Sequence, residues 1–201
     1  MKNIIFAFVI LLAGCTATKN TSIQKSNSIE KDFMTYLEAI ASKDFASGME
    51  YLVPEFFDIF PKADMIKVME ETFNNPLMTF NVKNPVITDV SKIETLDDKF
   101  YSKMTYTQLL ELSMGEEGEE SAREKEVRIA EEKRFFNQSF GEDNVEYNED
   151  TGFFLVKTKE DAIAVSKDGK SDWKFLVVQE KQMGILKELI PEDILKRFEL
   201  L

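Results

Sequence analysis

The sequence predicts an α+β domain in which a block of helices is followed by a block of mostly antiparallel strands. Apolar residues recur at helical spacing within residues 29–74, and from residue 77 onward they recur at every second position. Two further helical stretches close the chain at residues 183–189 and 192–198. Segregated runs of helices and strands are typical of the α+β class.

The helical block contains three segments. The first is a helix that begins near Ile29 and carries a single apolar stripe. Prolines then divide residues 45–61 into short, aromatic-rich turns. A second amphipathic helix covers residues 62–74 and stops before Pro76.

The strand block starts with a predicted hairpin, in which residues 86–93 and 100–112 are joined through residues 95–99. In the second of these strands Met104 and Tyr106 share one face with Leu110, while polar side chains occupy the other. We therefore expect one face of the sheet to be covered and the other to be wetter. Later strands are predicted at residues 145–147, 153–157, 161–166 and 172–179.

A charged segment, residues 115–141, interrupts the strands. Its Glu and Arg residues are spaced four apart in the order that stabilises a helix. Three apolar residues would form a narrow seam along this helix: Ile129, Phe136 and Phe140. Two roles stay open, a partner-binding arm or lid and a solvated insertion packed along the sheet.

The first fifteen residues resemble the signal of a bacterial lipoprotein. Lys2 gives a positive start, and residues 4–12 form an apolar run much shorter than the roughly 20 residues that a membrane-spanning helix needs. The run ends in Leu12-Ala13-Gly14-Cys15, which looks like a lipobox. The alternative is an ordinary secretory signal that contains a chance cysteine.

The lipobox resemblance implies that residues 1–14 are a signal peptide and that Cys15 carries acyl chains, such as palmitate. Two or three chains hold a protein durably on a bilayer, so Cys15 would be the only membrane contact. Thr16 stands where many inner-membrane lipoproteins carry an aspartate, which favours the outer membrane of the cell envelope. Residues 15–28 are predicted to form a flexible tether, and residues 29–201 a single domain.

Composition excludes several kinds of function. The chain has no histidine, which rules out histidine-dependent hydrolysis and histidine zinc sites. Its formal charge is −12, and loss of Lys2 with the signal makes it −13, which argues against nucleic acid as a partner. The carboxylates and glycines match no motif for a metal or a cofactor, and we predict neither.

The order of elements resembles the nuclear-transport-factor-two-like superfamily, also called SnoaL-like or the cystatin-like cone. The resemblance covers residues 29–179 and rests on three stretches: KDFASGMEYLVPEFF, residues 100–107, and SDWKFLVV. It implies a strongly bent sheet that wraps the first helix and leaves a conical cavity, which often binds small molecules. The charged segment and the helical tail depart from the minimal fold.

Aromatic residues are the candidate lining of such a cavity: Tyr36, Phe57, Tyr106, Trp173 and Phe175. The alternative is that they form ordinary core, because aromatic side chains supply much of the burial in a domain of this size. Relatives of the ketosteroid isomerase type use an Asp base with a Tyr and a second carboxylic acid. The sequence offers Tyr36 and Tyr106 but no spacing that matches this set, so we assign no catalytic residue.

Three functions stay open. The first is a membrane-anchored envelope lipoprotein that binds a small apolar ligand or a protein without catalysis, which the missing active-site set favours. The second is a small-molecule lyase or isomerase acting in a conical pocket, which the fold resemblance implies. The third is an envelope inhibitor or immunity-type protein for a basic partner, which the charge of −13 suggests. A dimer also stays open.

Overall fold

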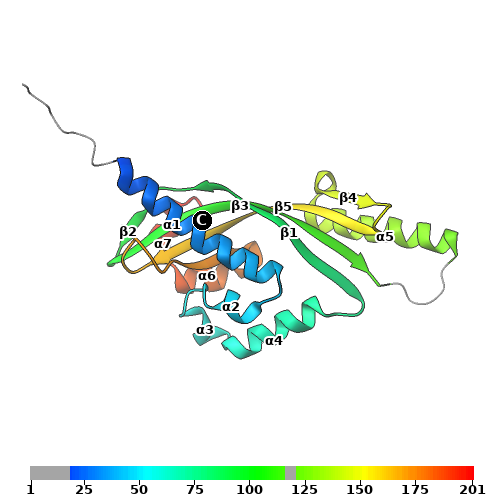
Figure 1. The fold of residues 1–201 in the computed structure, drawn as a ribbon, viewed down its shortest axis with the longest axis horizontal. Helices are drawn as coiled ribbons and strands as arrows, with labels where there is room; N and C mark the ends of the chain where they lie inside the picture. The colour runs from blue at the N-terminus through cyan, green and yellow to red at the C-terminus, as the bar shows by residue number, and fades with distance from the viewer. Residues whose placement is uncertain (1–18, 116–120) are drawn as a thin grey trace, which may run out of the picture.

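The computed structural model describes residues 19–115 and 121–201. Helices pack on a curved, open, six-stranded antiparallel sheet, which confirms the α+β fold class (Figure 1). The signal, Cys15 and the lipobox lie outside the described residues, as does the start of the charged segment, residues 116–120. No helix in the two described ranges has both the length and the hydropathy of a membrane span.

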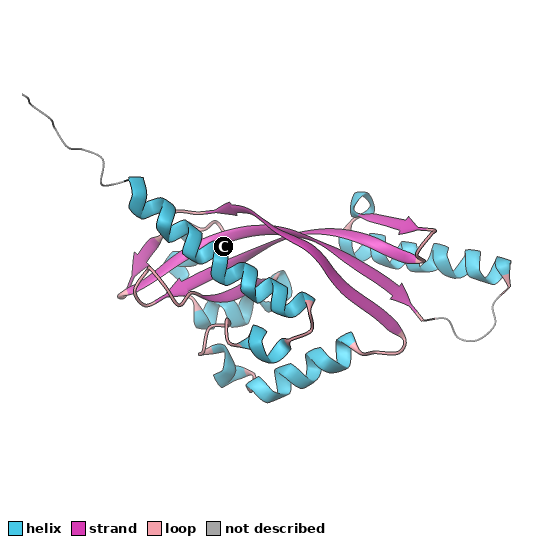
Figure 2. Ribbon diagram, in the orientation of Figure 1, coloured by secondary structure: helices cyan, strands magenta, loops and turns pink. Residues whose placement is uncertain are grey.

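Two long strands form the centre of the sheet, β3 (Lys99–Met114) and β5 (Phe153–Ser166) (Figure 2). They pair without interruption from Phe100↔Ser166 to Leu112↔Phe154. The outer strands are β1 (Met78–Val90), β2 (Glu94–Leu96), β4 (Val145–Asn148) and β6 (Lys174–Val178). β1 and β2 pair with β3, whereas β4 and β6 pair with β5.

The prediction of a hairpin between residues 86–93 and 100–112 is only partly right. Residues 86–90 belong to β1, which pairs with β3, but the strand directly before the turn is β2, within residues predicted mostly as the connection. Asp97 and Asp98 have positive φ angles of 49° and 59°, as a tight two-residue hairpin turn requires. β1 starts at Met78, eight positions before the predicted strand, and it bulges between Lys83 and Val86. The sequence does not predict the early part of this strand, because the bulge breaks the alternation of apolar and polar residues.

Strand β5 joins two stretches that the sequence predicts as separate strands, residues 153–157 and 161–166; the separation is wrong. Polar residues between them mask the apolar pattern, yet they keep the alternation of a strand. Thr158 is buried and Glu160 is half-buried on the same face as Val156, whereas Lys159 is exposed on the other face.

The expected difference between the two faces of the sheet is present along the middle of β3 but not near Tyr101 and Ile163, where the opposite face is also buried. Met104 and Tyr106 are buried and pack against the first helix, α1 (Lys19–Ala41). We call this side of the sheet the α1 face. On the opposite face of β3 the polar residues Lys103, Thr105 and Thr107 are only half-buried.

Helix α1 begins at Lys19, ten residues before the predicted start near Ile29. Most of the segment predicted as a tether is therefore helical. Residues 19–28 are polar apart from Ile23 and contain neither Gly nor Pro, so nothing in their composition stops a helix that tertiary packing has started. The remaining N-terminal helices are α2 (Phe45–Met49), α3 (Phe56–Ile59) and α4 (Lys62–Phe73), as predicted.

The charged segment forms the helix α5 (Ala122–Phe140), whose N-terminus is closed by a capping box between Ser121 and Glu124. Its predicted apolar seam is confirmed, because Phe136 is buried against Phe154 with ring centroids 5.1 Å apart. α5 lies on the α1 face at the far end of the sheet from α1, and a short 3-10 helix, Glu142–Asn144, leads from it into β4 (Figure 1).

Two short helices close the chain, α6 (Met183–Leu189) and α7 (Glu192–Arg197), as predicted. α7 covers the face opposite α1, where Ile194 and Leu195 are fully buried. α6 follows β6 through a 3-10 turn, Glu180–Gln182, and lies beside the N-terminal helices. This placement closes one side of a cavity.

Candidate functional site

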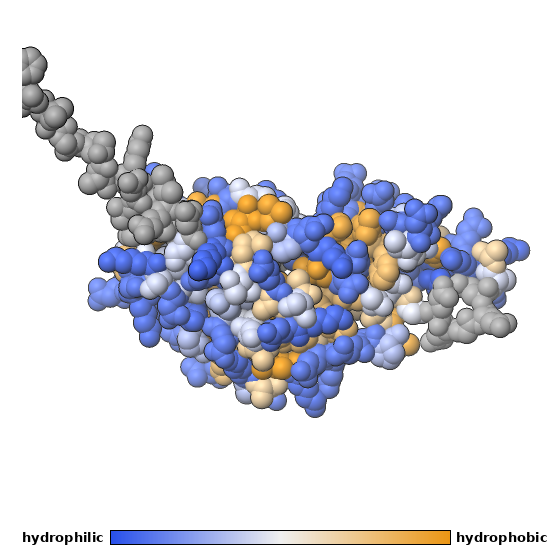
Figure 3. Space-filling view, viewed as in Figure 1, coloured by the Kyte–Doolittle hydropathy of each residue, from blue (hydrophilic) through white to orange (hydrophobic). Residues whose placement is uncertain are grey.

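A cavity of about 340 Å³ lies between the N-terminal helices, the α1 face of the sheet and α6. In Figure 3 apolar surface shows between the C-terminal end of α1 and the long strands, next to this region. Helical spacing places residues of α1 and α4 on the wall, and period-two spacing does the same for β1 and β3. Twenty described residues line the cavity: Tyr36, Leu37, Ile40, Met49, Leu52, Phe56, Met65, Met69, Phe73, Phe80, Val82, Tyr106, Gln108, Leu176, Val177, Gln179, Gln182, Ile185, Leu186 and Leu189.

None of these twenty described residues is charged. Three are methionines, Met49, Met65 and Met69, whose flexible side chains adapt to ligands of different shape. A volume of 340 Å³ falls at the lower end of the range of small-molecule sites, about 300–1,000 Å³. The wall therefore suits a small, mostly apolar molecule.

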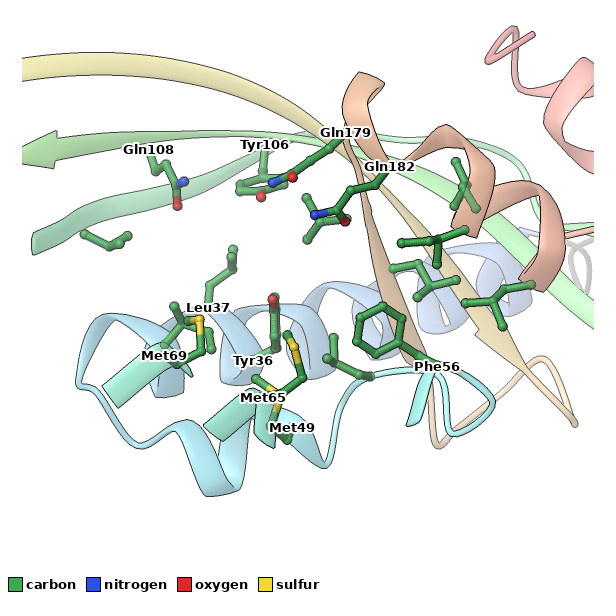
Figure 4. A pocket seen from close by; sticks show the side chains of 18 of the residues that line it. Tyr36, Leu37, Met49, Phe56, Met65, Met69, Tyr106, Gln108, Gln179 and Gln182 are labelled. Atoms are coloured by element: carbon green, nitrogen blue, oxygen red, sulfur yellow. The ribbon is translucent and has the colours of Figure 1, made fainter. Parts of the chain in front are cut away.

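The polar lining residues gather along one side of the cavity, with Tyr36 on the opposite side (Figure 4). Gln108 is half-buried, whereas Gln179 and Gln182 are exposed and so lie at the opening. Their side chains and the two tyrosine hydroxyls make no hydrogen bond to any other described residue. Each can therefore donate to, or accept from, a bound molecule.

The two tyrosines face a poorly solvated space. Burial raises the pKa of Tyr36 to about 12. Tyr36 keeps some exposed surface because it lines the cavity, but the helix and sheet around it keep bulk water from its hydroxyl. Burial also raises the pKa of Tyr106, with further contributions from Tyr36 and from Glu160. Both hydroxyls stay protonated at neutral pH and serve as neutral hydrogen-bonding groups.

Of the five aromatic residues predicted to line a cavity, the structure places two on its wall, Tyr36 and Tyr106. Phe57 is half-buried on α3, with the Lys62 ammonium 5.8 Å from its ring centre. Trp173 and Phe175 are fully buried in the core between α1 and the sheet. For these two residues the alternative of ordinary core holds.

The indole of Trp173 is fully buried, and its Nε1 has no hydrogen-bond partner among the described residues. Its backbone N–H donates to the Asp32 carboxylate at 3.2 Å, which ties the start of β6 to α1. This contact lies just before the strand that supplies Val177 to the cavity.

Sequence reasoning missed the glutamines and methionines of the wall. Gln108 lies two positions after Tyr106, and Gln179 two positions after Val177, so strand alternation places each beside a lining residue. Met65 and Met69 belong to the apolar stripe of α4. Such a stripe packs on core in most helices, and the sequence does not indicate that this one faces a cavity.

One carboxylate borders the cavity although it is not part of the wall. Glu160 pairs with Tyr106 across β3 and β5, and the side chains of such a pair share a face at about 5 Å. The β5–β6 pairing ends at Asp161↔Val178, and Glu160 and Gln179 are the next residues beyond that pair. Glu160 thus lies between two lining residues.

The described residues contain no group of three or more carboxylates or cysteines that could hold a metal ion. Cys15, the predicted lipid-attachment residue, lies outside them. No protein-family model and no curated protein sequence matches this chain. Its function must therefore be inferred from the cavity and from the sequence.

Proposed function

We propose that this protein is a lipid-anchored protein of the bacterial envelope whose domain binds a small, largely apolar molecule in the cavity. The observation that carries the proposal is the chemistry of the wall, whose twenty described residues are all uncharged. A binding site of this type fixes its ligand by shape and by a few polar groups. The hydroxyls of Tyr36 and Tyr106 and the Gln108 amide supply such groups.

Binding without catalysis agrees with the lining residues. Catalysis of proton transfer needs an acid or base near the reacting atoms with a pKa close to the working pH. The two tyrosines have raised pKa values and remain neutral, so they orient a ligand better than they deprotonate it. The lipid anchor is supported by the resemblance of Leu12-Ala13-Gly14-Cys15 to a lipobox.

A cavity-filling variant tests the binding site. Met69 points into the cavity from α4 and is half-buried, so Met69→Trp should fill part of the space with little strain (Figure 4). Val68→Trp is the matched control, because Val68 is the preceding residue of α4 and is 54% exposed. Calorimetric titration of octanol into the full chain, held in phosphatidylcholine nanodiscs with empty nanodiscs as the blank, measures binding.

We expect octanol to bind the wild type and Val68→Trp, and to bind Met69→Trp at least about tenfold more weakly. Equal binding by all three proteins would place the octanol elsewhere. Absence of binding to the wild type would contradict a small-ligand function.

The anchor is tested independently. We expect the wild type to incorporate labelled palmitate and to stay with membranes after a high-salt, high-pH wash, because acyl chains and not charges hold it. Cys15→Ser should incorporate no label. If Cys15→Ser stays lipidated and membrane-bound, Cys15 is not the anchor.

A small-molecule lyase or isomerase is the second candidate, and Glu160 is the observation that favours it. Burial and the neighbouring charge of Asp161 raise the pKa of the Glu160 carboxyl, which makes it a stronger base beside Tyr106. Exchange of a ligand C–H for deuterium, lost in Glu160→Gln, would support this reading. The third function, an inhibitor of a basic partner, stays a prediction, as does a dimer.

A further inference from the structure

A second hollow adjoins the cavity on the sheet. It is bounded by β1, β3, β5 and the C-terminal end of α5, and we call it the adjacent groove. Gln108 lines both the cavity and the adjacent groove, and Thr158 and Glu160 line the groove. A molecule longer than the cavity can therefore extend past Gln108 and Tyr106 and reach Glu160.

Glu160 has no cationic partner on its side of the sheet among the described residues. The lysines beside it in β5, Lys157 and Lys159, also contribute to the lining of the adjacent groove, but strand alternation directs their side chains to the opposite face and neither forms an ion pair with Glu160. Asp161 is also on that opposite face, where it accepts a hydrogen bond from Thr105 at 2.6 Å and lies 4.0 Å from the Lys103 ammonium. The Asp161 carboxylate thus has a hydrogen-bond donor and a nearby cation within the described part of the chain, whereas the Glu160 carboxylate has neither there.

Leaving Glu160 in this position costs stability. A half-buried carboxylate without a cation or a hydrogen-bond donor loses water and gains nothing in exchange. Burial raises the pKa of the Glu160 carboxyl, which reports the same cost. Thr158, the neighbour of Glu160 on this face of β5, is buried, and its Oγ1 has no hydrogen-bond partner among the described residues.

The groups around this point are complementary to a cation with N–H donors. The Glu160 carboxylate accepts hydrogen bonds, and the Gln108 side-chain oxygen and the Tyr106 hydroxyl oxygen can accept others. The Tyr106 ring, paired with Glu160, adds an aromatic face of the kind that attracts ammonium groups. The cavity itself is uncharged and suits the apolar part of the same molecule.

We propose that the ligand of this protein is an amphipathic amine, whose apolar body fills the cavity and whose ammonium group binds Glu160 between Tyr106 and Gln179. The assignment rests on the proposed binding function and adds the chemical class of the ligand. Glu160 is then a specificity-determining residue, because it selects a cation over a neutral or anionic group on the same apolar body.

Three probes that differ only in the polar group test the assignment: octylamine, octanol and octanoate. Each is titrated calorimetrically into the full chain in phosphatidylcholine nanodiscs, with empty nanodiscs as the blank. We expect octylamine to bind about tenfold more tightly than octanol, because hydrogen bonds to a charged group are the stronger ones. Octanoate should bind most weakly, because its carboxylate faces that of Glu160.

In Glu160→Gln the preference for octylamine should disappear while octanol binds as in the wild type. Glu160→Asp keeps the charge and should keep part of the preference. The matched control is Glu146→Gln, which removes one negative charge from β4 on the opposite face of the sheet and should leave the preference unchanged. This control separates a local ammonium site from general attraction to an acidic protein.

The outcomes distinguish the two proposals. If octanol binds the wild type but octylamine binds no more tightly, the ammonium site is wrong and the cavity function stands. Equal loss of the octylamine preference in Glu146→Gln and Glu160→Gln also overturns the site. If no probe binds the wild type, the cavity function itself fails.

Discussion

Replacement of Tyr36 by phenylalanine should make the folded protein less sensitive to alkali. Burial raises the pKa of Tyr36 to about 12 in the folded protein, against an ordinary value of about 10 in the unfolded chain. Between these values the unfolded chain releases the Tyr36 proton and the folded protein keeps it. Stability therefore falls as the pH rises through this window, by about 1.4 kcal/mol for each pH unit.

The expected magnitude at pH 11 follows directly. One unit above the unfolded pKa the wild type should have lost about 1.4 kcal/mol of unfolding free energy through Tyr36, and Tyr36→Phe should have lost none of this part. At pH 7 the two proteins should differ little, because the hydroxyl has no partner among the described residues. Tyr106 titrates above this window in the folded protein, so it contributes the same loss to both proteins.

Urea unfolding of the full chain in nanodiscs measures the effect. The only tryptophan, Trp173, is fully buried, so its fluorescence reports unfolding of the core. The quantity compared is the change in unfolding free energy from pH 9 to pH 11 in the two proteins. Parallel curves would refute the reasoning, because they would mean that the Tyr36 hydroxyl is solvated and that the cavity is wet.

Three further stability predictions use the same fluorescence assay. Glu160→Gln should raise the unfolding free energy at pH 7 by up to about 1 kcal/mol, because the raised pKa of the Glu160 carboxyl means that the fold disfavours its charged form. This gain should vanish at acid pH, where the Glu160 carboxyl of the wild type is protonated. A lower unfolding free energy of the variant at pH 7 would contradict this. Phe33→Ala should cost about 3–5 kcal/mol, because Phe33 is fully buried against Phe175 with ring centroids 4.8 Å apart; a cost below about 1 kcal/mol would show that the core refills the space. Gly169→Ala should cost about 1–3 kcal/mol, because Gly169 has a φ of 63° and an added Cβ would lie 2.6 Å from the Phe100 ring; an unchanged urea midpoint would mean that the turn relaxes freely.

Local pattern predicted the elements that have one clear period. The apolar stripe of α4 and the alternation of β3 each follow from a single spacing, and both are present. Prediction failed where polar residues break the pattern, as between the two parts of β5, or where a helix extends beyond its apolar stripe, as at the start of α1. In both cases tertiary packing overrides local preference.

The site was predictable only in part. Tyr36 and Tyr106 stand out as aromatic residues on apolar faces, and both line the cavity. That Glu160 lies between Tyr106 and Gln179 depends on the registers of three strands that are distant in sequence. No local spacing encodes those registers, so the carboxylate that distinguishes this site appears only in the fold.

The long pairing of β3 with β5 has a consequence for how the chain folds. Its nearest partners, Leu112 and Phe154, are 42 residues apart, and its farthest, Phe100 and Ser166, are 66 apart. Such pairings are slow, because the loop between them must close before any contact forms. α5 forms quickly from local contacts and occupies nearly half of that loop, so its burial against Phe154 brings the two strands together at their near end. Pairing can then proceed residue by residue toward Phe100. The charged helix would thus set the order of assembly, with the cavity completed last.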